Sequence, residues 1–120
     1  MAVFASRQIV MPVLTVAVTI TGSGNGTCYV IINGTQHYSG TSSDISVMPG
    51  DIITFSVKGY NSAYPGELTI DGERFIYVTT ETSSTYDWKV PYRLKSIKIT
   101  MSYFTTYNNK YCGEITVTTA

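Results

Sequence analysis

Residues that could carry out acid–base or metal chemistry are few and scattered in this sequence of 120 residues. The single histidine, His37, has no carboxylate or cysteine close to it in the chain. A catalytic triad needs a base that is held by an orienting group beside a nucleophile, and a zinc site needs about four cysteine, histidine or carboxylate ligands. The chain shows neither arrangement. We therefore expect His37 to lie on the surface of a protein that is not an enzyme and uses no metal or cofactor.

The acidic residues add little chemistry, although four aspartates fall in or near expected loops: Asp44, Asp51, Asp71 and Asp87. None belongs to a loop that alternates Asp or Asn with other residues, as an EF-hand calcium loop does. Turn or strand positions explain most of them, so no calcium site is predicted. The stretch 22–26 is rich in glycine but does not lie between a strand and a helix. It therefore predicts a flexible turn and not a phosphate-binding loop.

Tyrosine is the one residue type in clear surplus, with ten copies. Its large, rigid ring and its hydroxyl favour interfaces at a small cost in conformational entropy, and the ring also suits stacking on sugars. Tyrosine is also a good strand former on a half-buried sheet, which accounts for many of the ten. The candidates for a surface-binding role are the tyrosines expected in loops: Tyr60, Tyr64, Tyr92 and Tyr107.

Charge is sparse and balanced. Charged residues make up 13% of the chain, and eight basic residues balance eight acidic ones. Without a basic cluster, the sequence lacks the charge pattern of a nucleic-acid binder. A weakly charged surface suits a subunit packed against neighbours, but it also suits a secreted domain rich in serine and threonine, and composition leaves both open.

The longest apolar region, residues 9–20, is not expected to be a membrane span. It is interrupted by Pro12, Thr15 and Thr19 and is too short to cross a bilayer. It is also a poor signal peptide, because Phe4 lies in the would-be basic region and Pro12 breaks the apolar run. We therefore interpret the N-terminal region as part of the folded structure and expect no membrane interaction.

Alternation with a period of two predicts β-strands along almost the whole chain. The clearest alternating runs are 14–20, 28–32, 53–57, 86–90 and 97–103, with a shorter strand at 45–47 and a polar connection at 79–85. Turn sequences lie between several of them, namely Asn33-Gly34, Pro49-Gly50-Asp51 and Asp71-Gly72. About seven to nine strands at this spacing predict an all-β fold, a single antiparallel Ig-like β-sandwich over residues 13–120. The residues expected in its core are Leu14, Val16, Val18, Val30, Ile32, Phe55, Ile70, Trp88, Ile97 and Ile99.

The two cysteines, Cys28 and Cys112, could form one disulfide or remain small buried thiols. Alternation places Cys28 on the inward face together with Val30, whereas Cys112 shares its parity with Glu114 and is expected to point outward. This parity disfavours the disulfide, unless a bulge at Gly113 reverses it.

Two short motifs resemble those of a known family. The stretch 47–55, VMPGDIITF, followed by Gly59-Tyr60, resembles the turn and strand of Ig-like modules in bacterial surface repeats, PEGA-type domains and virion proteins of tailed phages. The stretch 66–72, GELTIDG, fits the same style. The single tryptophan, Trp88, is not placed as in antibody-type domains, so the similarity concerns the architecture.

The resemblance implies a virion structural protein of the capsid decoration (head auxiliary) kind. Such a protein would bind the assembled shell, with the major capsid protein or other virion subunits as partners, and would form a homo-oligomer on the capsid surface. The alternative is a carbohydrate- or cell-surface-binding module, from a phage fibre or a bacterial surface protein, which would bind a host glycan through loop tyrosines and Trp88.

Residues 1–12 form an apolar segment that precedes the first alternating strand. Its large apolar members are Val3, Phe4, Ile9, Val10 and Met11, and Pro12, which cannot donate to a central strand ladder, separates them from that strand. Exposed apolar surface costs roughly 25 cal/mol per Å². We therefore predict an extended arm that docks on another subunit; an edge strand of the same sandwich is the other interpretation.

Overall fold

The computed structural model describes residues 13–20, 28–102 and 112–119, and all regular structure in these ranges is β-strand. The ten strands are β1 (Leu14–Ile20), β2 (Cys28–Ile32), β3 (Thr35–His37), β4 (Gly40–Val47), β5 (Ile52–Lys58), β6 (Gly66–Ile70), β7 (Glu73–Val78), β8 (Ser83–Lys89), β9 (Ser96–Ser102) and β10 (Gly113–Thr119). The predicted all-β class is confirmed, and the strand count is slightly above the expected range.

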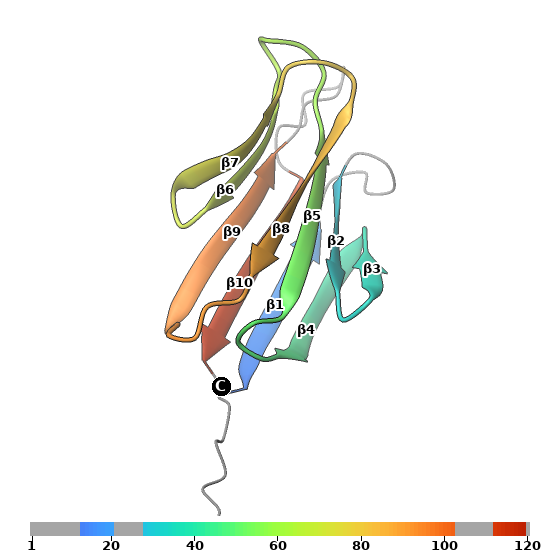
Figure 1. Cartoon of the computed structure of the whole chain (residues 1–120). Helices are drawn as coiled ribbons and strands as arrows, with labels where there is room; N and C mark the ends of the chain where they lie inside the picture. Colours follow the sequence, from blue (N-terminus) through green and yellow to red (C-terminus); the bar gives the residue numbers. More distant parts are fainter. Residues whose placement is uncertain (1–12, 21–27, 103–111, 120) are drawn as a thin grey trace, which may run out of the picture.

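The strands form two sheets that face each other (Figure 1). One has six strands in the order β4-β1-β10-β9-β6-β7, and the other has four in the order β3-β2-β5-β8. Every named pairing is antiparallel, from the β10–β9 pair at the centre of the first sheet to the β5–β8 pair of the second. The arrangement is an antiparallel β-sandwich, consistent with an Ig-like architecture.

The core lies between the sheets and follows the alternation of the sequence. In β1 each even-numbered residue is buried, whereas the side chains between them are exposed or half-buried. The same pattern holds in β2 and β6. Nine of the ten predicted core residues are buried, including Trp88, and Ile97 near the start of β9 is half-buried and packs against the others. The inward faces of both sheets therefore exclude water as the pattern predicted.

The two predicted hairpin turns are confirmed. Asn33 and Gly34 have φ of 51° and 77°, and Asp71 and Gly72 have φ of 51° and 84°. Two consecutive residues with positive φ between paired strands define a type I′ turn, whose twist matches that of the flanking strands. The Pro49-Gly50 turn is also confirmed, since Gly50 has φ of 91° and the Asp51 amide donates to the Met48 carbonyl.

Two strands are longer than the sequence predicted. The edge strand β4 starts at Gly40, earlier than predicted, because a β-bulge interrupts the alternation on which the prediction depended. Val16 pairs with Ile45 and Val18 with Ser42, so one residue of β1 faces two of β4. Asp44, in the bulge, has φ of 62°. Strand β8 includes the polar residues 83–85, which pair with the end of β5 and do not form a loop. In both places main-chain pairing overrides an uninformative side-chain pattern.

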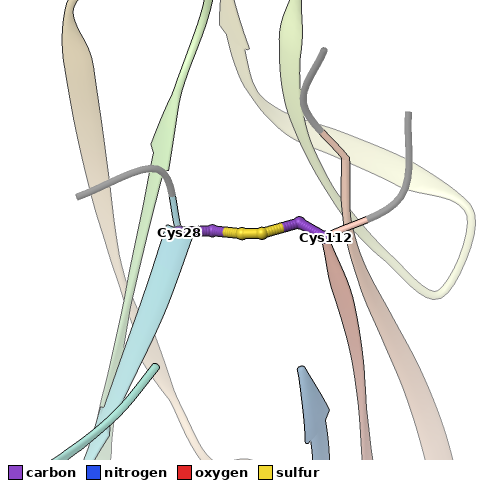
Figure 2. Close-up of a disulfide and its surroundings, with 2 residues drawn as sticks. All are labelled: Cys28 and Cys112. Atoms are coloured by element: carbon purple, nitrogen blue, oxygen red, sulfur yellow. A yellow bond between two sulfur atoms is a disulfide. The ribbon is translucent and has the colours of Figure 1, made fainter. Parts of the chain in front are cut away.

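A disulfide joins Cys28 at the start of β2 to Cys112 just before β10, so it connects the two sheets (Figure 2). Both cysteines are fully buried, and their Cα atoms are 6.5 Å apart. The expectation from parity that disfavoured this bridge is therefore wrong. Disulfides persist mainly in secreted proteins and on cell or virion surfaces.

The parity argument failed because Cys112 and Gly113 are both buried. Gly113 pairs with Met101, and the amide of Cys112 also donates to the Met101 carbonyl, at 3.0 Å. Two consecutive residues thus face Met101, as in a β-bulge, and the alternation restarts at Gly113. A side chain at Gly113 would place its Cβ 2.7 Å from the Thr19 carbonyl, so only glycine fits there without a shift.

Candidate assembly surface

Four large apolar side chains are exposed at one end of the sandwich: Val13, Met48, Ile52 and Tyr92, with exposed fractions of 46%, 48%, 49% and 67%. We call these residues the apolar end face. Val13 precedes β1, Met48 and Ile52 flank the turn between β4 and β5, and Tyr92 lies between β8 and β9. Single exposed apolar residues are ordinary, whereas several at one end make that end a candidate for a contact surface.

Main-chain hydrogen bonds hold the loops of this end together. The Gly50 amide donates to the Val90 carbonyl at 2.7 Å, and the Val90 amide donates to the Asp51 carbonyl at 2.8 Å. The turn after β4 and the chain leaving β8 are therefore fixed to each other. A surface carried by mutually bonded loops is largely ordered before it binds, which lowers the entropic cost of association.

A shallow groove with a volume of about 530 Å³ opens at the same end. It is lined by Leu14, Tyr92, Arg93, Leu94, Lys95 and Thr119. The Thr119 amide donates to the Lys95 carbonyl at 2.9 Å, and the Thr119 hydroxyl donates to the Leu94 carbonyl. The end of β10 thus holds the loop that forms the groove wall, and its floor includes the buried side chain of Leu14.

The charge at this end is positive. Lys89, Arg93 and Lys95 are exposed there, and none of them forms an ion pair within the described ranges. Asp51 is the acidic residue of the adjoining turn, and its carboxylate accepts the Met48 amide at 2.9 Å. The ion pairs seen in the described residues lie elsewhere: Arg74 with Glu67, and Lys98 with Glu114. The groove therefore combines an apolar floor, one exposed aromatic ring and cations available to a ligand.

The candidate tyrosines do not gather on one surface. Tyr60 and Tyr64 lie between β5 and β6, beyond the Lys58 end of β5, whereas Tyr92 follows the Lys89 end of β8. Since Lys58 pairs with Ser83 at the start of β8, these are opposite ends of the sandwich. Tyr60 and Tyr64 are half-buried in a tight turn, in which the Asn61 side chain accepts the Tyr64 amide. Tyr107 lies outside the described residues.

The arm residues Val3, Phe4, Ile9, Val10 and Met11 also lie outside the described ranges. The position where this segment joins the domain is defined, however, because Val13 belongs to the apolar end face. Met48, Ile52, Arg93 and Lys95 were not recognised from the sequence as site residues. The sequence signal available was the apolar residue on each side of the Pro49-Gly50-Asp51 turn, but only the fold shows that these loops share one end.

Potential metal ligands do not cluster in the described part of the chain. No group of three or more histidine, cysteine or acidic side chains there is placed to hold a metal ion. His37 is half-buried on the short edge strand β3, opposite Val30. Among the same residues, no helix is long and apolar enough to cross a bilayer.

The fold and the site define a small antiparallel β-sandwich with an apolar, positively charged end face. No family model matches the sequence, and neither a curated protein nor a solved structure matches it.

Proposed function

We propose that this chain is a non-enzymatic structural component of a virus particle, of the kind that decorates the outside of a capsid and stabilises the shell. The observation that carries the proposal is the apolar end face, where Val13, Met48, Ile52 and Tyr92 are exposed together. The apolar segment 1–12 enters the domain at Val13, so the two apolar features are continuous in the chain. A rigid block with one contact end suits a subunit that binds a shell of repeated copies.

The disulfide and the charge pattern support the same role. Cys28 and Cys112 form a buried covalent link between the sheets, as suits a protein that works on a virion surface exposed to an oxidising medium. Few charges and no net charge reduce repulsion between copies packed at high density. The major capsid protein is the partner we expect, with further copies of this chain beside it.

The test is co-sedimentation with empty shells assembled from the major capsid protein of the same virus. The chain should pellet with the shells and raise the temperature at which they open. Met48→Glu with Ile52→Glu should abolish both effects, because it places charges in the contact. The matched control is Thr41→Glu with Ser43→Glu on the exposed edge of β4, away from the end face. Failure of the unmodified chain to bind would refute the proposal.

A carbohydrate- or cell-surface-binding module is the second candidate, and the specific observation in its favour is Tyr92. Among the described residues, Tyr92 has the largest exposed fraction of the large apolar side chains, and it borders the groove next to Arg93. An aromatic face beside a cation suits an acidic sugar. Screening immobilised glycans tests it: binding that Tyr92→Ala removes, without any binding to shells, would favour this function over the first.

A further inference from the structure

We propose that the groove at the apolar end face receives the β6–β7 hairpin tip of a second copy of this chain. The tip consists of Asp71, Gly72 and Glu73, and the receiving residues are Tyr92, Arg93 and Lys95. This inference rests on the proposed function, which it deepens by naming the surfaces through which copies touch one another on the particle.

The tip has the opposite charge to the groove. Asp71 and Glu73 are both exposed, and neither forms an ion pair in the described part of the chain. The nearest strand supplies Lys98, whose carbonyl accepts the Asp71 amide, but the Lys98 ammonium is paired with Glu114 at 3.1 Å. Two uncompensated acids therefore project at the tip, while two uncompensated cations line the groove. Complementary potentials of this kind fix the register and the choice of partner.

The shape of the tip also fits. A type I′ turn of two residues is the narrowest connection between paired strands, and Gly72 carries no side chain. Strand β7 is an edge of the six-stranded sheet (Figure 1) and Asp71, Gly72 and Glu73 are exposed, so the tip is accessible to a neighbour. The groove, at about 530 Å³, falls within the range of pockets that enclose small ligands.

The contact joins two different surfaces, so it either closes across a two-fold axis or repeats from copy to copy. A contact between one hairpin tip and one groove is small, and small interfaces are typical of weak, transient association in solution. On a particle that holds the copies close together, the effective concentration is high and the same contact becomes significant. Since the attraction is between exposed charges, it should weaken as salt is added.

The experiment is a charge exchange followed by sedimentation velocity at low salt over a range of protein concentrations. The groove variant is Arg93→Glu with Lys95→Glu, and the tip variant is Asp71→Asn with Glu73→Lys. Asn is chosen at position 71 because it tolerates the positive φ found there. The unmodified chain should self-associate. Each variant alone should associate about tenfold more weakly or not at all, because its tip and groove carry like charges.

The equimolar mixture of the two variants should regain the association of the unmodified chain, since each tip then meets a groove of opposite charge. The matched control is the single chain Asp44→Asn with Glu81→Lys, which changes the net charge by the same amount as the tip variant at other exposed sites. It keeps the native tip and groove and should therefore self-associate like the unmodified chain. Thermal melting of every variant checks that its fold is intact.

A chain that is monomeric at every concentration at low salt would overturn the inference, as would variants that associate like the unmodified chain. Loss of self-association in the control chain would do the same, because association would then follow net charge and not the charges of the tip and the groove. Binding to empty shells is measured separately. If the charge exchange fails while shell binding persists, the inference falls and the proposed function stands.

Discussion

The ring of Phe75 lies 4.8 Å from the ring of Tyr86, centroid to centroid, with the ring planes tilted by 41°. Phe75 is on β7, the edge of the six-stranded sheet, and Tyr86 is on β8, the edge of the four-stranded sheet. Phe75 falls where the β6–β7 register shifts, between the residue paired with Leu68 and the residue paired with Thr69. The bulge frees Phe75 from the ladder, and its ring joins the edges of the two sheets.

This aromatic contact should contribute measurably to stability. We expect Phe75→Ala and Tyr86→Ala each to lower the free energy of unfolding, and the double variant to lose less than the sum of the two. The coupling should be about 0.5–1.5 kcal/mol, the range for tilted aromatic pairs. Urea unfolding of the four proteins measures it. Tyr92→Ala, at an exposed tyrosine, is the control and should change stability little. Strict additivity would mean that the rings do not interact.

The disulfide should stabilise the domain strongly. It closes a loop with a sequence separation of 84 residues, so replacing both cysteines by alanine should lower the free energy of unfolding by about 2–5 kcal/mol. A reductant should lower the melting temperature of the unmodified protein and have no effect on the Cys28→Ala, Cys112→Ala variant. Identical melting of the unmodified protein with and without reductant, after thiol titration has shown the bond to be open, would contradict the prediction.

The hairpin glycines should tolerate asparagine better than valine. At Gly34 and Gly72 an added Cβ would meet no atom within 4 Å, so the cost of substitution comes from positive φ and not from a clash. Valine at either position should therefore lower the free energy of unfolding by about 1 kcal/mol or more. Asparagine adopts this conformation more readily and should lower it less. Thermal melting of the four single variants tests this order. Equal losses for valine and asparagine would show that backbone conformation is not the cause.

Deletion of residues 1–11 separates the two interpretations of the N-terminal segment. If the segment is an assembly arm, the free energy of unfolding of the truncated domain should lie within about 0.5 kcal/mol of that of the full chain, because surface changes remote from the core cost little stability. The truncated domain should also no longer bind shells. Urea unfolding and co-sedimentation measure the two effects. A truncated domain that does not fold would show that the segment belongs to the domain's own sandwich, and a folded one that still binds shells would eliminate the arm.

The sequence predicted the sheet interior well and the site poorly, for physical reasons that particular residues show. Burial imposes a period of two, so residues such as Val16, Phe55 and Trp88 could be placed in the core from spacing alone. A bulge breaks that period, and Gly113 marked only a possible position for one, which is why parity placed Cys112 on the wrong face. The apolar end face depends on which loops meet. Met48 and Tyr92 are distant in the chain, and only the pairing of β5 with β8 brings their loops to one end.

The pairing of Leu14 with Thr119 has a mechanical consequence. The outer ends of β1 and β10 lie side by side, so a force that pulls these two residues apart acts across the strands and loads the hydrogen bonds of the pair one after another, like a zipper. The peeling proceeds toward Ile20 and Gly113 and then meets the covalent link between Cys28 and Cys112, which takes up the load. The chain enclosed by the disulfide is thereby shielded from tension, and under load the domain can lengthen only by the short segments outside that loop.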